Sequence, residues 1–307
     1  MYGVIDIGSN TIRLVIYKIE KNHLKPMINK KYTAGLAGYI ESDGNMSQKG
    51  IQILVNTLLE LRQIIQNINV QEIFLFGTAS LRNSANTQEI LTAVKKYCGF
   101  DIQVLSGEQE ATFDYYGVIQ NPVHSNGLLV DIGGGSTELV FFQNNEIVHT
   151  DSLPIGSLNL FNRFVADIIP TAEEVRDIKR EVKRQLQSID MPEDSELHIQ
   201  PTIYGVGGTA RAAAKIIASL TGEAAGQLRE YSCEKLKFVL SKLETDEKEV
   251  VRSILKVVPE RVHTIVPGMI TLKTISGCYN TKNIITSNYG VREGYLHFLL
   301  KKRGILV

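Results

Sequence analysis

A segment near the start of the chain recurs in its middle, and this repeat constrains the fold more than any other feature. Residues 6–16 read DIGSNTIRLVI and residues 131–141 read DIGGGSTELVF. The two align without a gap at an offset of 125 residues, from Asp6 to Asp131. We therefore expect two similar domains, each with its own core.

Each copy of the repeat is predicted to form a strand, a glycine-rich turn and a second strand, because apolar runs flank both turns. Glycines permit positive φ and leave backbone N–H groups exposed, which is how a loop cradles phosphate oxygens. An ordinary hairpin turn would need only the first glycine, so two matched copies favour phosphate binding. The candidate phosphate-binding residues are Gly8, Ser9 and Asn10 in one copy and Gly133, Gly134, Gly135 and Ser136 in the other.

The rest of the chain alternates between predicted helices and strands, which is typical of an α/β protein. A capping box of Thr171 and Glu174 marks the start of one long helix. Further helices are expected over 48–66, 84–97, 210–219, 233–243, 247–256 and 291–302, with one opening at 108. Further strands are expected over 72–76, 102–105, 147–153, 202–206 and 283–286.

The 307 residues are about twice the roughly 150 residues of a typical domain. The best linker candidate is the segment 120–127, which holds Asn121-Pro122 between a predicted helix and a predicted strand. We therefore expect domains at 1–124 and 125–307. Whether the last helix, about 291–307, packs back on the first domain is left open.

Composition excludes several classes of protein. Thirty-three Lys and Arg balance 33 Asp and Glu, whereas non-specific binding to nucleic acid or to an anionic membrane requires a basic surplus. Three cysteines without C-x-x-C spacing encode neither a disulfide framework nor a zinc site. No secretory signal and no apolar stretch of about 18 residues is found. We expect a cytoplasmic protein with no membrane or nucleic-acid partner.

Two glutamates, Glu108 and Glu110, lie in the first turn of a predicted helix capped by Ser106 and Gln109. The helix dipole favours carboxylates at this position, so both can be structural. Either can instead be a general base that takes a proton from water. The spacing alone leaves the choice open.

Asp6, Asp131 and Glu138 are candidate Mg²⁺ ligands, because acids at strand ends beside a phosphate loop supply the hard oxygen ligands that this ion prefers. The alternative for the two aspartates is that each caps its own turn.

Three further sites carry cationic or anion-binding character. Arg82 follows a strand end, where it can bind a phosphate or pair with Glu89. Gly207, Gly208 and Thr209 form a third glycine turn before a helix, which suits an anion. Arg292 begins the last helix and is a candidate for the same site.

Together these motifs resemble the exopolyphosphatase and guanosine pentaphosphate phosphohydrolase (Ppx/GppA) family, in its short two-domain form. The resemblance rests on VIDIGSNTIRLVI at 4–16, GTASLRN at 77–83, LSGEQEA at 105–111, VDIGGGSTELV at 130–140, GVGGTARAAA at 205–214, VPGM at 266–269 and GVREG at 290–294. It implies two actin-like (ribonuclease H-like) domains of the actin, sugar kinase and heat-shock chaperone superfamily, with the active site in the cleft between them.

The resemblance also implies roles for individual residues. Glu110, which directly precedes Ala in the family motif, becomes the catalytic glutamate. Asp131 and Glu138 fall at the Mg²⁺ and phosphate site, Arg82 falls on a substrate phosphate, and the loop from Asp6 faces them from the other lobe. The chain departs from the motif at Gln109, where the family usually has glutamate.

The implied activity is Mg²⁺-dependent hydrolysis of the terminal phosphoanhydride of inorganic polyphosphate by a homodimeric enzyme. Guanosine pentaphosphate (pppGpp) is the alternative substrate, since its terminal anhydride is chemically the same bond. Two other classes stay open, a kinase of the same superfamily and a non-catalytic sensor that binds alarmone nucleotides.

Overall fold

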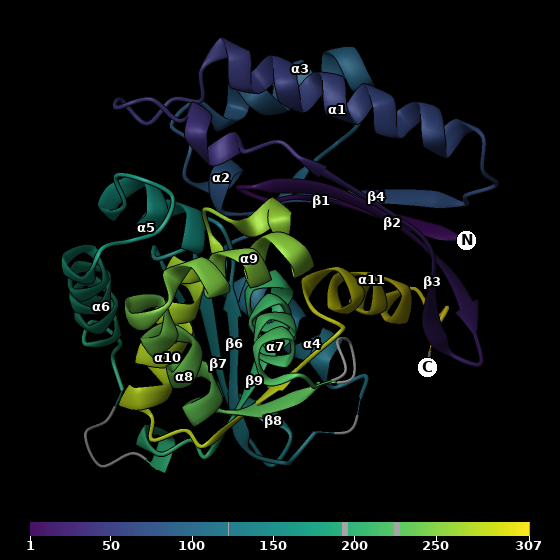
Figure 1. Ribbon diagram of the computed structural model, residues 1–307. Coiled ribbons are helices and arrows are strands. Elements are labelled where there is room, and N and C mark those ends of the chain that lie inside the picture. Colours follow the sequence, from purple (N-terminus) through teal and green to yellow (C-terminus); the bar gives the residue numbers. More distant parts are fainter. Residues whose placement is uncertain (122, 192–195, 224–227, 307) are drawn as a thin grey trace. The chain divides into compact units, whose positions relative to one another are not determined.

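The computed structural model describes residues 1–121, 123–191, 196–223 and 228–306 of the chain (Figure 1). Contacts between Cα atoms divide it into two compact units, Met1–Gly117 with Val291–Val307, and Val118–Gly290. The border thus lies before the predicted one, and the last helix counts with the first unit. Pro122, in the predicted linker, lies outside the described residues.

The first unit is built on a five-stranded sheet in the order β3-β2-β1-β4-β5. The central strand β1 pairs antiparallel with β2 and parallel with β4, and β2 pairs antiparallel with β3. The strands are β1 (Tyr2–Ile7), β2 (Thr11–Glu20), β3 (His23–Thr33), β4 (Glu72–Gly77) and β5 (Gln103–Val104). The helices are α1 (Gln48–Gln66), α2 (Ala79–Arg82), α3 (Thr87–Cys98), α4 (Gly107–Val118) and α11 (Val291–Lys302), with the 3-10 turn η1 (Leu36–Tyr39).

The second unit repeats this arrangement in a six-stranded sheet, β10-β11-β9-β6-β7-β8. Here β6 takes the place of β1, antiparallel to β7 and parallel to β9. The strands are β6 (Gly127–Ile132), β7 (Thr137–Gln143), β8 (Glu146–Leu153), β9 (Thr202–Val206), β10 (Glu230–Ser232) and β11 (Asn283–Thr286). The helices are α5 (Ser157–Phe164), α6 (Ala172–Leu186), α7 (Gly207–Thr221), α8 (Cys233–Thr245), α9 (Glu247–Val257) and α10 (Ile265–Cys278), with the 3-10 turns η2 (Glu196–His198) and η3 (Pro259–Arg261).

Three structural features recur at the offset of 125 residues found in the sequence: the closing hydrogen bond of the turn, the partner of the strand-end Asp, and a register shift. They are Gly8 N–H to Thr11 O and Gly133 N–H to Ser136 O, both 3.0 Å; the pairs Asp6–Arg13 and Asp131–Glu138; and the shifts at Ile16/Tyr17 and Phe141/Phe142. The predicted repeat and the predicted α/β fold in two similar units are thus confirmed.

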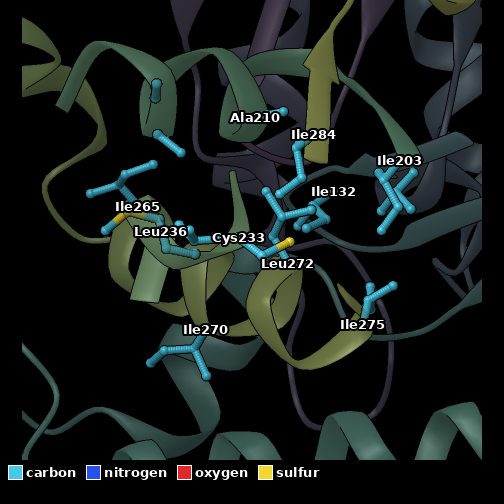
Figure 2. Close-up of a cluster of buried hydrophobic side chains, with 14 of the residues drawn as sticks. Ile132, Ile203, Ala210, Cys233, Leu236, Ile265, Ile270, Leu272, Ile275 and Ile284 are labelled. Atoms are coloured by element: carbon cyan, nitrogen blue, oxygen red, sulfur yellow. The ribbon is translucent and has the colours of Figure 1, made fainter. Parts of the chain in front are cut away.

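Each unit has its own apolar core. In the first unit, α1 and α3 pack on one face of the sheet, and α4 and α11 pack on the other (Figure 1). In the second, helices α6 to α10 cover the face of the sheet that carries Ile132, Ile203 and Ile284 (Figure 2). Within the described residues, no helix combines the length and apolar character that crossing a bilayer requires.

Most predicted elements are present, but the strands β3 and β10 and the helices α2, α5 and α10 were missed. Helix α10 is buried on nearly all sides, so its sequence lacks the apolar stripe by which a surface helix is recognised. Strand β3 carries Pro26 and several lysines, which are residues that sequence patterns count against a strand. It tolerates them because it lies at the edge of the sheet.

Helix α6 begins with the predicted capping box and is held by a charged cluster. Thr171 Oγ1 accepts from Glu174 N–H at 3.3 Å, and Glu174 Oε2 accepts from Thr171 N–H at 2.7 Å. One turn from its end, the buried Glu181 accepts two hydrogen bonds from Arg184, at 2.8 and 2.9 Å, and one from Arg163 at 3.3 Å. The bonds from Arg184 lower the pKa of Glu181 from 4.5 to about 2.

Replacing this carboxylate with an amide, Glu181→Gln, should therefore destabilise the protein in a pH-dependent way. Since the pKa is lower in the folded state, the stabilisation is present above pH 4.5 and is lost as the pH falls from 4.5 towards 2. We expect the free energy of unfolding to fall by about 1–2 kcal/mol at neutral pH, less than the full shift implies because the arginines are partly exposed.

Urea unfolding at neutral pH and near pH 3 measures this difference. Glu173→Gln, an exposed glutamate of the same helix, is the matched control. A loss that is equal at both pH values, or that the control reproduces, would contradict the role assigned to Glu181.

Candidate active site

The first loop, Gly8 to Thr11, is anchored through its carbonyl groups. Beyond the closing bond of the turn, Ser9 O accepts from Ala37 N–H at 2.9 Å, and Asn10 O accepts from the amides of Ala34 and Gly35 at 3.0 and 2.9 Å. The carbonyl oxygens that would repel an anion are thus engaged by the segment after β3. This leaves the loop suited to presenting amides to a phosphate.

Behind this loop, four side chains from β1, β2 and α11 form a buried polar cluster. Arg292 donates to Asp6 Oδ2 at 2.7 Å, and the Tyr17 hydroxyl donates to Glu293 Oε1 at 2.5 Å. Burial raises the pKa of Asp6 against the opposing effect of Arg292. Burial would lower the pKa of Arg292, but the carboxylates of Glu293 and Asp6 together raise it. Arg292 is therefore a permanent positive charge next to the first loop.

Arg82, at the end of α2, pairs with Glu110 in the first turn of α4. Its guanidinium donates to Glu110 Oε2 at 2.8 Å and to Leu105 O at 3.2 Å. The alternative partner, Glu89, instead accepts from Gln48 and Asn86. The structure thus brings together two of the predicted site residues that lie 28 positions apart.

The first turn of α4 also separates its two glutamates. The predicted capping box is confirmed: Gln109 Oε1 accepts from Ser106 N–H at 3.0 Å, and Ser106 Oγ accepts from Gln109 N–H at 3.1 Å. Glutamine therefore performs the capping that a glutamate would perform at this position. Glu108 is exposed, whereas Glu110 is buried against Arg82.

The second loop, Gly133 to Ser136, is anchored in the same manner as the first. Gly133 O accepts from Ser157 N–H at 2.8 Å, and Gly134 O accepts from the amides of Leu158 and Asn159 at 3.0 Å. These donors are the first amides of α5, which are otherwise unsatisfied at a helix start. A side chain at Gly156 would meet the backbone of Gly134 at 2.3 Å, so only glycine permits this approach.

Asp131 and Glu138 stand directly opposite each other on β6 and β7, with their side chains on one face of the sheet. Glu138 is 1% exposed and accepts from the Ser152 hydroxyl at 2.9 Å. Two carboxylates in register fit Mg²⁺, which usually takes one or two protein carboxylates and completes its shell with waters and phosphates. Among the described residues, no group of three or more His, Cys, Asp and Glu side chains is arranged to hold a metal ion.

The third glycine turn makes room for two charged side chains. Gly207 has φ +76°, and a Cβ there would lie 2.1 Å from Asp131 Oδ1. A Cβ at Gly208 would lie 1.7 Å from the guanidinium of Arg261. Thr209 is fully buried and donates its hydroxyl to Ile132 O at 2.8 Å, so it ties α7 to the end of β6.

Arg261, in η3, was missed by the sequence reasoning. Burial lowers the pKa of its guanidinium, which the carboxylates of Glu260 and Asp131 partly offset. No local pattern marks this arginine, because its neighbours Gly208 and Asp131 lie more than 50 residues away in the chain. The only available signal was the glycine pair itself, since two adjacent glycines indicate that something approaches the backbone closely.

With this geometry in hand, comparison with known proteins identifies the family. The family model described as the Ppx/GppA phosphatase family matches residues 15–303. The chain belongs to the Ppx/GppA phosphatase family. The predicted enzyme class, a phosphoanhydride hydrolase, is confirmed with it.

Relatives and solved structures in this family cover the chain to different extents. Exopolyphosphatase 1 of Mycobacterium tuberculosis is 32% identical over 56% of this chain and 51% of that protein. The guanosine-5′-triphosphate,3′-diphosphate pyrophosphatase of Photobacterium profundum is 25% identical over 98% of this chain and 60% of that protein. The chain thus spans about half to three-fifths of the length of these relatives.

A solved structure shows the same fold over nearly the whole length of both chains. The crystal structure of an exopolyphosphatase from Cytophaga hutchinsonii superposes with a TM-score of 0.86 at 24% identity, and 98% of each chain is covered.

Two glycines of α7 allow the role of Gly207 in this Ppx/GppA chain to be isolated. Gly207 and Gly222, at opposite ends of the helix, have φ +76° and +75°, but nothing lies within 4 Å of a Cβ at Gly222. Gly222→Ala should cost about 1–2 kcal/mol of stability from the left-handed backbone alone. Gly207→Ala should cost more and should displace Asp131.

Urea unfolding and phosphate release measure the two effects. We expect Gly207→Ala to lower turnover at least tenfold, about 1.4 kcal/mol of transition-state stabilisation, while Gly222→Ala retains it. Equal behaviour of the two variants would show that Asp131 does not depend on the space left by Gly207.

Proposed function

We propose that the chain is a Mg²⁺-dependent exopolyphosphatase, which hydrolyses the terminal phosphoanhydride of inorganic polyphosphate and releases orthophosphate. The observation that carries the proposal is the ion pair of Glu110 and Arg82. The carboxylate of Glu110 is buried in the first turn of α4, and the guanidinium of Arg82 donates to it at 2.8 Å. The ion pair stabilises the charged carboxylate, which is the form able to accept a proton.

In the proposed reaction, Glu110 accepts a proton from a water molecule, whose oxygen attacks the terminal phosphorus. The bond from this phosphorus to the bridging oxygen breaks, orthophosphate is released, and the shortened polyphosphate leaves with the electron pair of that bond. The guanidinium of Arg82 and the loop amides stabilise charge on the phosphoryl oxygens. Residues of both units are taken to act on one substrate, as the resemblance implies.

The metal enters the proposal through Asp131 and Glu138, whose paired carboxylates fit a hard cation. When bound, Mg²⁺ supplies positive charge that neutralises the phosphate oxygens and orients the terminal group. Asp6 remains a predicted ligand; its ion pair with Arg292 gives it a second role in fixing that arginine next to the first loop.

Guanosine pentaphosphate is the second candidate substrate. It is favoured by the Photobacterium profundum relative, whose name states guanosine-5′-triphosphate,3′-diphosphate pyrophosphatase and which aligns over 98% of this chain. The name of the Mycobacterium tuberculosis relative favours polyphosphate. Both substrates present a phosphate tail with the same terminal bond.

The role of Glu110 is tested by Glu110→Gln, which keeps the shape of the side chain but removes the base. Phosphate release should fall by about 10²–10⁴-fold, while binding of polyphosphate is retained. Glu108→Gln, in the same turn and exposed, is the matched control and should retain full activity. Unchanged turnover in Glu110→Gln, or equal losses in both variants, would rule out Glu110 as the base.

The substrate and the metal are tested together in one set of assays. Phosphate release is measured from polyphosphate and from guanosine pentaphosphate, each with Mg²⁺ and with excess chelator. We expect release from polyphosphate to be faster and to stop in the chelator. Faster release from guanosine pentaphosphate would assign the alternative substrate, and release that persists in the chelator would contradict the metal proposal.

A further inference from the structure

Positive charge is concentrated on one hairpin of the first unit although the chain as a whole is neutral. Residues 11–33, which form β2, β3 and the turn between them, carry six basic side chains and one acidic one. The basic residues are Arg13, Lys18, Lys21, Lys25, Lys30 and Lys31, and the acidic residue is Glu20. The net charge of this hairpin is +5 in a chain whose total is zero.

The internal repeat supplies a control for this concentration of charge. The equivalent hairpin of the second unit, residues 137–153 with β7 and β8, has three acidic residues and neither Lys nor Arg, a net charge of −3. Both β3 and β8 are edge strands, where lysines commonly prevent pairing with other chains. Strand β8 is an edge strand that carries no lysine, so edge protection alone does not explain the lysines of the first hairpin.

The first hairpin is also longer than its counterpart, and the added length is basic. Four residue pairs follow the register shift in β2–β3, whereas two follow the equivalent shift in β7–β8. The added length brings Lys18 and Lys25 opposite each other. Both pair with Glu20, at 3.1 and 3.0 Å, but remain more than half exposed, so these contacts neutralise little of the charge.

The turn of this hairpin holds a lysine where the backbone disfavours one. Lys21 and Asn22 have φ +49° and +66°, which is a turn with two left-handed residues, and the second hairpin places Asn144 and Asn145 at +53° and +62°. Asparagine and glycine adopt this conformation readily, whereas lysine is strained in it. Asparagine at position 21 would remove this backbone strain, so the presence of lysine indicates a function for its side chain.

The exposed lysines of this hairpin follow the strands from the end of the first loop to the turn. Strand β2 begins at Thr11, where that loop ends, and Lys30 on β3 stands opposite Leu14, three residues further along β2. From Thr11 the ten residues of β2 extend about 33 Å to the turn. We call the four exposed lysines along this path, Lys18, Lys21, Lys25 and Lys30, the basic ribbon.

We propose that the basic ribbon binds the part of a long polyphosphate chain that lies beyond the terminal phosphates. This rests on the proposed function and extends it, because it gives the enzyme a preference for long chains. Each lysine that neutralises a phosphate releases a counterion, so the contribution is strongest at low salt. Tripolyphosphate and guanosine pentaphosphate are too short to reach the turn.

The test is a triple variant, Lys21→Asn, Lys25→Gln and Lys30→Gln. Lys21→Asn copies the turn residue of the second hairpin, so the hairpin should fold at least as stably as before. The matched control removes the same charge from exposed lysines on helices α1 and α3 of the same unit, through Lys49→Gln, Lys95→Gln and Lys96→Gln. Direct binding of labelled long-chain polyphosphate and KM for long-chain polyphosphate and tripolyphosphate are measured at low and high salt.

The ribbon variant should bind long-chain polyphosphate about tenfold more weakly at low salt, and the slope of log Kd against log salt should fall by about 2 for three lost lysines. Its KM for tripolyphosphate and the behaviour of the control should not change. Equal losses for both chain lengths, no loss, or a loss shared by the control would overturn the proposal. So would weaker binding of a single-stranded RNA with unchanged binding of polyphosphate.

These outcomes separate the ribbon from the proposed activity. If the unaltered protein releases no phosphate from any polyphosphate, the proposed function fails, yet the binding comparison between the two variants still decides whether the ribbon holds a polyanion.

Discussion

The turn that follows the central strand of each sheet determines where the charged residues of the site lie. In both units one glycine amide closes this turn at 3.0 Å, two residues after an aspartate at the strand end. The antiparallel pairing that follows sets one residue opposite each aspartate. Backbone carbonyl oxygens of both loops accept hydrogen bonds from amides of later segments, and these bonds hold each loop in place from one side.

The two copies of this arrangement have diverged in charge. In the first unit the strand-end aspartate faces Arg13 and pairs with Arg292, while in the second Asp131 faces the carboxylate of Glu138. The hairpins that continue from these positions differ in net charge in the same direction, with +5 in the first unit and −3 in the second. One copy therefore concentrates cations and the other concentrates carboxylates, which suits the roles in phosphate and metal binding that we propose for them. Burial of the charges of Asp6 and Arg292 is costly, and their ion pair offsets part of the cost.

Sequence reasoning succeeded where a local pattern decided the structure. Two capping boxes and the register of the repeat follow from residues close together in the chain, and all three are present in the structure. It failed where contacts between distant segments determine the structure. Helix α10 is buried and has no amphipathic period, and strand β3 tolerates its proline and lysines only because it lies at the edge of the sheet. Arg261 and the pairing of Arg82 with Glu110 depend on segments that only the folded chain brings together.

In the proposed function, residues from both copies of the repeat serve one reaction, and a double-mutant cycle tests this most directly. Glu110→Gln in the first unit and Asp131→Asn in the second are compared singly and together by kcat/KM for phosphate release from polyphosphate. Residues that act as one catalytic unit give strongly non-additive losses. We predict that kcat/KM of the double variant lies within about tenfold of that of the worse single variant. Losses that multiply would show that the two residues act independently and would contradict it.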